Sequence, residues 1–405
     1  MHIVADEAIG WVRDAFDGLG RLQTLPGPAI DAAAVRDADV LLTRTVTRVD
    51  EALLSGSRVR FVGSCTAGVD HVDRGWLQRN GIAFAHAPGC NARAVAEYVV
   101  TALCVLWAED ALDAPRDPVV VVGFGAIGRI VTALLRALGR EVRVCDPPLA
   151  EQQGVAPSTE RFWPLDEALE GARAVTLHVP LIHDGAHPTA HLLDAHRLDR
   201  LAPGSIVINT SRGSVVDDAA LEAWARATGG RAVLDVWEGE PHLRWSLLRG
   251  EPSPVRLATP HVAGYTCEGK VEATAMVHRA LMQWLGRPVS FDAVHGLGAT
   301  GAEPLVPCPR EVLPNAAGDD GRAALARCLL AIAPLHRDDA SVRALLELPE
   351  DRRPRAFEML RKGYALRREA SHFCASGELD RLPAGGLSSS VTEALGHLGV
   401  GLAPC

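Results

Sequence analysis

The sequence predicts an α/β protein with two doubly wound parallel sheets, followed by a C-terminal α+β region. Short β-rich runs alternate with helix-length segments through the first two thirds of the 405 residues. The runs are separated by about 15 to 25 residues, so they need crossover connections, which give βαβ units and parallel pairing. Several runs are apolar throughout, as expected for strands that helices cover on both faces.

Ten runs are predicted as strands, in two sets. The first set is HIVAD from His2, VLLTR from Val40, RFVGS from Arg60 and IAFAHA from Ile82. The second set is VVVVGFG from Val119, EVRVCD from Glu141, AVTLHVP from Ala174, SIVINTS from Ser205, RAVLDVW from Arg231 and VRLATPH from Val255. Ten strands are too many for one ordinary sheet. We therefore expect two sheets of the Rossmann or flavodoxin-like kind, joined near the amphipathic stretch 94–107.

The chain changes character after about Pro288. Residues 292–314 are rich in Gly, Ala and Pro and are predicted to form a linker or irregular loop. Helices are expected over 323–332 and 357–368, and the small-residue tail from Pro383 is expected to end in disorder. Residues 288–405 are therefore predicted to form a third domain of mixed α and β structure.

Bulk composition excludes several classes of protein. Lys and Arg total 41 against 50 for Asp and Glu, a net charge of -9, which opposes broad binding to nucleic acid or to an anionic membrane. No apolar run approaches the 18 residues that suggest a membrane span. The nine cysteines are odd in number, scattered and without a C-x-x-C pair, so neither a zinc site nor a disulfide framework is expected. We expect a reduced cytoplasmic protein without a metal.

A glycine motif predicts a dinucleotide site. The run Gly123-Phe124-Gly125-Ala126-Ile127-Gly128 follows the strand VVVV and precedes the helix-like IGRIVTALLRALG. Glycines in this context permit a tight turn and close approach of the backbone to a pyrophosphate at a helix N-terminus. Asp146 closes the next strand, 18 residues past Gly128, where a carboxylate binds the adenosine ribose and repels a 2′-phosphate. The motif predicts NAD rather than NADP; the alternative is a glycine turn that only packs a helix on a sheet.

Three polar residues follow consecutive strands of the second set. Arg212 follows SIVINTS, Glu240 follows RAVLDVW, and His261 ends VRLATPH. Ligands of open α/β sheets bind outside the carboxyl ends of the strands, so the three side chains are expected to converge. Histidine can take the proton of a secondary alcohol, a carboxylate can orient the imidazole, and arginine can bind a substrate carboxylate. Each residue alone would more often be a local hydrogen bonder.

At these residues the sequence resembles a known family. GFGAIG with Asp146, LHVPL, INTSRG, DVWEGEP and TPHVAGYT resemble the D-isomer-specific 2-hydroxyacid dehydrogenases. Further segments are similar to the 4-phosphoerythronate dehydrogenase branch of bacterial vitamin B6 synthesis, over about residues 1–370. These segments are TRTVTRVDEALLSG, FVGSCTAGVDHVD, APGCNARAVAEYV, CDPP, HVAGYTCEGK, HRDD and LRKGYALRRE. The stretch 110–118 and the tail after Glu369 depart from the pattern.

The resemblance implies an activity, a cofactor and roles for individual residues. It implies NAD-dependent oxidation of 4-phospho-D-erythronate to 2-oxo-3-hydroxy-4-phosphobutanoate on the route to pyridoxal phosphate. It makes Arg212 and Glu240 active-site residues and His261 the proton donor or acceptor. The implied substrate contacts are Thr45, Thr66 and Tyr265, and the implied NAD contacts include Asp146, Thr176, Ser211, Asp235 and Gly264.

The resemblance also organises the chain into domains. Residues 1–93 and 264–287 are expected to form a substrate-binding lid domain, and residues 94–263 an NAD-binding domain, with hinges near residues 93 and 264. Residues 288–405 are expected to form a homodimer. Because the substrate carries a phosphate, Arg44 beside Thr45 is a candidate for its binding, although Arg44 could equally form a surface ion pair.

Two other functions stay open on the sequence alone. One is a related D-2-hydroxyacid dehydrogenase, such as one acting on 3-phosphoglycerate, although the C-terminal segment does not resemble the usual regulatory module of that enzyme. The other is a non-enzymatic NAD(H)-sensing binding protein, which the intact set Arg212, Glu240 and His261 disfavours.

Overall fold

The chain divides into two compact units. A computed structural model describes residues 1–109, 117–152, 160–293, 297, 303–308, 321–375 and 389–404. One unit comprises Met1–Arg93 and Tyr265–Gly301, and the other comprises Ala94–Gly264 and Ala302–Cys405. The chain thus leaves the first unit after Arg93 and re-enters it after Gly264, the two places where the sequence predicts hinges.

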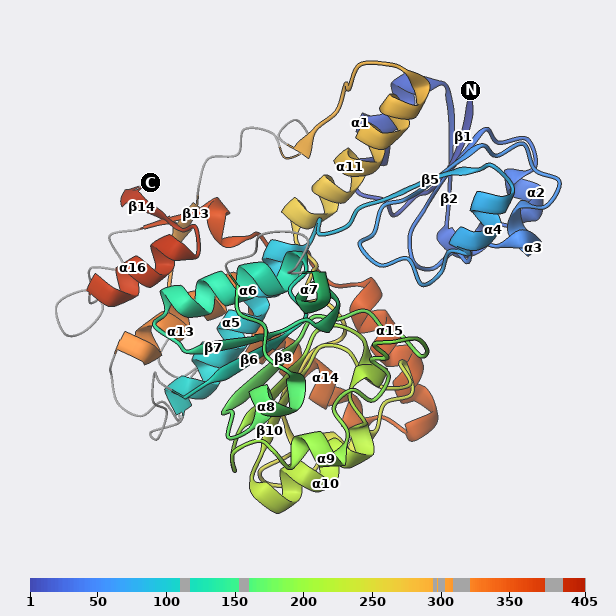
Figure 1. Ribbon diagram of the computed structural model, residues 1–405. Coiled ribbons are helices and arrows are strands. Elements are labelled where there is room, and N and C mark those ends of the chain that lie inside the picture. Colours follow the sequence, from blue (N-terminus) through green and yellow to red (C-terminus); the bar gives the residue numbers. More distant parts are fainter. Residues whose placement is uncertain are drawn as a thin grey trace. The chain divides into compact units, whose positions relative to one another are not determined.

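The first unit is built on a five-stranded parallel sheet with helices on both faces (Figure 1). Its order is β2-β1-β3-β4-β5, the flavodoxin-like order. The strands are β1 His2–Asp6, β2 Arg21–Leu25, β3 Val40–Thr43, β4 Phe61–Ser64 and β5 Ala83–His86. The helices are α1 Val12–Phe16, α2 Ala32–Val35, α3 Glu51–Leu54, α4 Arg74–Arg79 and α11 Cys267–Leu285. Successive residues of a strand point to opposite faces of the sheet. Ile3 packs in the hydrophobic cluster that includes residues of α11, and Val4 packs in the cluster that includes residues of α2, α3 and α4.

Strand β2 was missed by the sequence analysis. Its sequence RLQTL is half polar, and its side chains are partly exposed throughout. The strand lies at the edge of the sheet and pairs only with β1 among the described strands. An edge strand is not buried on both faces, so it lacks the continuous apolar run that identifies its neighbours.

The second unit contains a six-stranded parallel sheet of order β11-β10-β9-β8-β6-β7. The strands are β6 Val119–Val122, β7 Val142–Cys145, β8 Ala174–Leu177, β9 Ile206–Asn209, β10 Arg231–Leu234 and β11 Val255–Ala258. The helices before residue 264 are α5 Ala92–Glu109, α6 Ala126–Ala137, α7 Pro147–Gln152, α8 Leu165–Leu169, α9 Ala195–Leu198 and α10 Asp218–Thr228. All ten predicted runs are strands, and the prediction of two doubly wound parallel sheets is confirmed.

Helix α5 is buried on nearly every side, so its predicted amphipathic character is wrong. Residues 94–108 of this helix are almost all inaccessible. The cause lies far along the chain, because α13 Gly321–Ile332 and α16 Ser389–His397 bury apolar residues in the same core cluster as α5. The C-terminal segment therefore shares its core with the six-stranded sheet, and residues 302–405 group with residues 94–264 in one compact unit.

The C-terminal segment has more regular structure than the sequence predicts. Its strands β12 Glu303–Leu305, β13 Phe373–Ala375 and β14 Gly401–Pro404 form a parallel sheet of that order. Strand β12 lies inside the predicted loop, α16 lies in the small-residue tail from Pro383, and β14 lies at the end of that tail, which is predicted to be disordered. The other helices are α14 Leu335–Arg343 and α15 Arg353–Lys362. Helix α15 begins earlier than predicted, with Pro354 in its first turn, and ends before Gly363.

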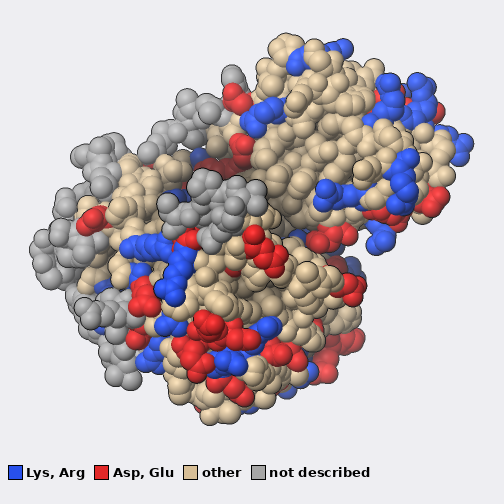
Figure 2. Space-filling view, viewed as in Figure 1, with Lys and Arg blue, Asp and Glu red and all other residues tan. Residues whose placement is uncertain are grey.

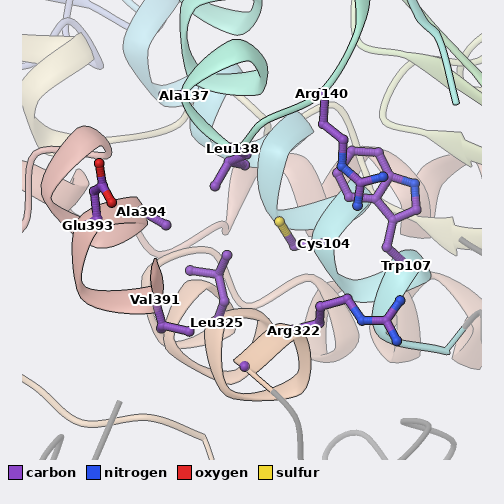
Figure 3. Close-up of a pocket in the computed structure, with 11 residues that line it drawn as sticks. Cys104, Trp107, Ala137, Leu138, Arg140, Arg322, Leu325, Val391, Glu393 and Ala394 are labelled. Carbon is purple, nitrogen blue, oxygen red and sulfur yellow. The ribbon is translucent and has the colours of Figure 1, made fainter. Parts of the chain in front are cut away.

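A pocket of about 420 Å³ lies between α5, α6, α13 and α16 (Figure 3). Cys104, Leu138, Leu325 and Val391 line its apolar part. At one side, the guanidinium of Arg140 stacks 3.6 Å from the centre of the Trp107 ring. None of the predicted site residues lines this pocket.

Several charged side chains on the described surface form ion pairs. Figure 2 shows acidic and basic side chains interleaved over α8, where Arg197 binds Asp166 at 3.0 Å and Arg200 binds Glu170 at 3.3 Å. Within the described ranges, no helix is both long enough and apolar enough to cross a bilayer. Seven described cysteines are free, whereas Cys374 is disulfide-bonded, which the scattered spacing did not predict.

Candidate active site

The three glycines of the turn after β6 have different surroundings. Gly123 has a φ of +94°, and a Cβ there would lie 2.5 Å from the carbonyl oxygen of His178. A Cβ on Gly128 would lie 1.9 Å from the carbonyl oxygen of Gly123. A Cβ on Gly125 would meet nothing within 4 Å, although Gly125 is the N-cap of α6. Two glycines therefore close the turn, and the third leaves open space at a helix N-terminus, which fits a pyrophosphate.

The other predicted cofactor residues of this region lie around the same turn. Strands β6 and β8 are neighbours, while β7 lies on the outer side of β6, so the chain order reverses here. Asp146, directly after β7, accepts hydrogen bonds from Phe124 N at 2.8 Å and Leu149 N at 3.0 Å. Ala126 and Ile127 begin α6. Thr176 is buried in β8, and its hydroxyl lies 3.0 Å from Nε2 of His178.

His178 is held neutral at this edge of the sheet. Burial lowers the pKa of His178 to about 3, and its Nδ1 atom is inaccessible. An imidazole with this pKa carries no charge near neutral pH. His178 is therefore a structural neighbour of the turn rather than a proton carrier.

His261 and Glu240 form a pair. Nδ1 of His261 lies 3.0 Å from Oε2 of Glu240, and both side chains are partly exposed, 31% and 20%. The other carboxylate oxygen of Glu240 accepts from Trp237 N at 2.8 Å, which orients the carboxylate. Because Nδ1 of His261 is hydrogen-bonded to Glu240, the second ring nitrogen, Nε2, is the atom that can accept or donate a proton.

The backbone at His261 is strained, and Asp235 holds it. His261 has a φ of 60°, a left-handed conformation that costs a non-glycine residue about 1 kcal/mol or more. The buried Asp235 accepts from Val262 N at 2.7 Å, from Ala263 N at 3.0 Å, and from the hydroxyl of Thr259 at 2.6 Å. Asp235, which the resemblance assigns to NAD, thus holds the loop that carries His261 in this structure.

Arg212 follows β9 in a loop that contacts the Glu240 loop. Asn209 organises the turn: its Nδ2 donates to the carbonyl oxygen of Arg212 at 2.8 Å, and its Oδ1 accepts from both N and Oγ of Ser211. A Cβ on Gly213 would lie 2.0 Å from the carbonyl carbon and oxygen of Trp237. Only glycine allows this approach, so the two loops are in contact. The guanidinium of Arg212 donates to the carbonyl oxygen of Ser211 at 2.7 Å.

The predicted substrate residues belong to the first unit. Arg44 pairs with the buried Asp6, its Nε lying 3.1 Å from Oδ2. Thr45 is exposed. The hydroxyl of Thr66 lies 2.7 Å from Ser64 Oγ and donates to the carbonyl oxygen of Gly68 at 3.0 Å.

Tyr265 begins the return of the chain into the first unit. The ammonium of Lys270, one turn into α11, lies 4.1 Å from the centre of the Tyr265 ring. Gly264 immediately precedes this point and closes the second unit.

Sequence reasoning missed two positioning residues. Asn209 holds the Arg212 turn, and Tyr98 of α5 binds the hydroxyl of Thr259 at 2.7 Å. Asn209 lies within INTSRG, so its adjacency to Arg212 could have indicated it. Tyr98 is 161 positions from Thr259, and no local pattern indicates such a contact. Over the described residues there is no cluster of three His, Cys, Asp or Glu side chains suited to a metal.

Comparisons with known proteins relate the chain to a family. Residues 108–263 match the model of the D-isomer specific 2-hydroxyacid dehydrogenase NAD-binding domain. The chain is 45% identical over 393 residues to a protein named erythronate-4-phosphate dehydrogenase from Azotobacter vinelandii, covering 94% of this chain and 97% of the relative. It is 47% identical over 289 residues to the protein of that name from Chromohalobacter salexigens, covering 71% and 73%. The crystal structure of the TT0316 protein from Thermus thermophilus superposes with a TM-score of 0.58 at 25% identity, covering 73% of this chain and all of that one.

Proposed function

The chain belongs to the erythronate-4-phosphate dehydrogenases, among the D-isomer specific 2-hydroxyacid dehydrogenases, and we propose how its residues perform that reaction. The protein is an NAD-dependent oxidoreductase that converts 4-phospho-D-erythronate to 2-oxo-3-hydroxy-4-phosphobutanoate in the synthesis of pyridoxal phosphate. The observation that carries the assignment of residues is the His261–Glu240 pair after β10 and β11.

His261 is the general base in this proposal. Its Nε2 takes the proton of the C2 hydroxyl, while Glu240 on Nδ1 stabilises the imidazolium that forms. NAD, when bound, supplies the acceptor for the hydride that leaves C2. In the reverse direction His261 returns its proton to the oxygen of the 2-oxo group.

Arg212 binds the carboxylate of the substrate. Its planar guanidinium can bind two oxygens at once, and its turn is held by Asn209 and packed against Trp237. Such binding places C2 at a defined distance from the loop of His261. Thr45, Thr66 and Tyr265 as substrate contacts, and Arg44 as the phosphate ligand, stay predictions. The pairing of Arg44 with buried Asp6 gives that arginine a structural role as well.

NAD occupies the glycine turn of the second unit. The open space at Gly125 supports this placement, with Ala126, Ile127 and Gly128 supplying the start of α6. Asp146 is the ribose ligand, and Thr176, Ser211, Asp235 and Gly264 are the further candidates on the same edge of the sheet.

Gly125→Ala tests the cofactor site without a structural penalty. Gly125 has a φ of -76° and a ψ of -156°, which alanine adopts freely, and its Cβ would contact no protein atom. We expect the melting temperature to change by less than about 2 °C. The methyl group would meet the pyrophosphate, so the Kd of NADH, measured by fluorescence titration, should rise at least about tenfold.

Gly128→Ala is the matched control for that experiment. Its Cβ would overlap the carbonyl oxygen of Gly123, so it should lower the melting temperature before any ligand is added. Unchanged NADH affinity in Gly125→Ala would show that the cofactor does not lie against this turn.

A panel of substrates tests the activity directly. Initial rates with 4-phosphoerythronate, 3-phosphoglycerate and D-lactate separate the candidate dehydrogenases, measured at 340 nm without 2-oxoglutarate and as 2-hydroxyglutarate formed with it. We expect kcat/KM for 4-phosphoerythronate to exceed the others by at least about 10²-fold. The 2-oxoglutarate accepts hydride from any NADH that remains bound after a first turnover. Because this transfer regenerates NAD, the 340 nm absorbance stays flat in the presence of 2-oxoglutarate, and turnover is measured there as the 2-hydroxyglutarate formed. Flat absorbance without 2-oxoglutarate, together with no 2-hydroxyglutarate in its presence, for every substrate would favour a binding protein.

In this proposal the C-terminal segment, residues 288–405, is the dimerisation domain and joins two copies of the chain in a cytoplasmic homodimer. The other two proposed domains are the lid (1–93, 264–287) and the NAD-binding domain (94–263). Four large apolar side chains among the described residues of this segment are exposed, Val289 at 51%, Val306 at 59%, Met359 at 58% and Leu366 at 40%, and they are candidates for the interface.

A further inference from the structure

Side chains of the C-terminal segment bind the backbone on both sides of His261. Strand β11 is an edge strand, and α14 packs along it. Asp339 of α14 accepts from Ala258 N, the last residue of β11, at 2.9 Å. Arg367, in the segment after α15, donates to the carbonyl oxygen of Ala263 at 3.0 Å. His261 therefore lies between two points at which the C-terminal segment holds the chain.

Arg367 is almost fully buried and paired. Its Nη2 also donates to the carbonyl oxygen of Ala94 at 2.6 Å, and its Nη1 lies 3.5 Å from Oε2 of Glu97 on α5. The two side chains are 7% and 2% exposed. Glu97 also accepts from Ala370 N through both oxygens, at 3.1 and 3.2 Å. Burying an ion pair is costly compared with apolar packing, so a specific role for Arg367 is expected.

The backbone of Ala263 is held through both its N–H and its carbonyl group. Asp235 accepts its N–H at 3.0 Å, and Arg367 donates to its carbonyl oxygen. Two residues earlier, His261 has its left-handed backbone, which persists only where the surroundings hold it. Asp235, which directly follows β10, binds this loop from the six-stranded sheet, and Arg367 binds it from the C-terminal segment.

We propose that Arg367 is a positioning residue for proton transfer: through the carbonyl oxygen of Ala263 it keeps the loop of His261 in the conformation in which Nδ1 meets Glu240. The inference rests on the proposed role of His261. It makes the C-terminal segment necessary for turnover, beyond any part in dimerisation, because a side chain of this segment acts on the catalytic loop.

The test removes the cation and its counter-ion together. In Arg367→Met/Glu97→Gln no buried charge is left unpaired, and the full chain is assayed with NAD and 4-phosphoerythronate. We expect kcat to fall about 10- to 100-fold while both KM values stay within about threefold. Arg367→Lys, which keeps the charge and one donor group, should lie between this variant and the parent.

Arg353→Met is the matched control. Arg353 is equally buried in the C-terminal segment, but it donates to the carbonyl oxygens of Leu346 and Leu348 within that segment. We expect its kcat to stay within about twofold of the parent.

A His261→Ala background separates positioning from general destabilisation. If Arg367 acts through His261, the double change should cost no further rate in that background. An equal loss there, or a parental kcat in the folded Arg367→Met/Glu97→Gln variant, would overturn the inference. Should circular dichroism show that this variant is unfolded, Arg367→Lys decides, and an unchanged kcat overturns the inference. If His261→Ala alone keeps its turnover, the proposed function fails instead.

Discussion

Replacement of His261 by alanine is expected to lower kcat about 10³-fold, because the variant has no group to take the hydroxyl proton. His261 lies 3.0 Å from Glu240, beyond the carboxyl end of β11, and the glycine turn follows β6 in the same sheet. The side chain takes no part in the turn, so the Kd of NADH should change less than about threefold. Steady-state rates and NADH fluorescence titration measure the two quantities separately.

His191→Ala is the matched control for the histidine. His191 also pairs with a carboxylate, Glu238, at 2.6 Å, and this hydrogen bond raises the pKa of His191. Its side chain is 49% exposed, and, unlike His261, His191 does not come shortly after a strand of the six-stranded sheet. We expect its kcat within about threefold of the parent. Retained turnover in His261→Ala, or an equal loss in His191→Ala, would refute the assignment of the base.

Strands were predictable where burial is two-sided. The runs VVVV at β6 and AVTL at β8 are buried at every position and almost wholly apolar, because helices cover both faces of the sheet. Strand β2 and the C-terminal strands lack that signal: β2 is an edge strand, and β12 and β13 have three residues each. The surroundings of α5 could not be predicted either, since the helices that cover it lie more than 200 positions further on.

The site was predictable where it depends on local order along the chain. Arg212, Glu240 and His261 each follow a recognisable strand, and parallel strands place their carboxyl ends on one edge. In the structure Nδ1 of His261 lies 3.0 Å from Oε2 of Glu240, whereas the catalytic roles of the two residues stay proposals. The supports of the site were not predictable, because Tyr98 and Arg367 reach it across 161 and 104 positions. Such contacts depend on how the packed elements meet.

Arg212→Lys is expected to lower kcat/KM for 4-phosphoerythronate about 10²-fold, and Arg212→Met about 10³-fold. Lysine keeps the charge but offers a single ammonium in place of two parallel N–H donors. The backbone of the turn should persist in both variants, because Asn209 binds the carbonyl oxygen of residue 212 rather than its side chain. Circular dichroism melting and the Kd of NADH should therefore stay close to those of the parent.

Arg200→Lys is the control, because it makes the same arginine-to-lysine change in the second unit at a residue outside the proposed site. Arg200 pairs with Glu170 at 3.3 Å on the surface, and such pairs contribute about 1 kcal/mol or less. Its kcat/KM should not change measurably. A carboxylate site at Arg212 also predicts that the methyl ester of the substrate loses far more rate with the parent enzyme than with Arg212→Met, because only the parent recognises the charge. Equal discrimination by the two enzymes would place the substrate carboxylate on another residue and leave Arg212 as a support of the turn.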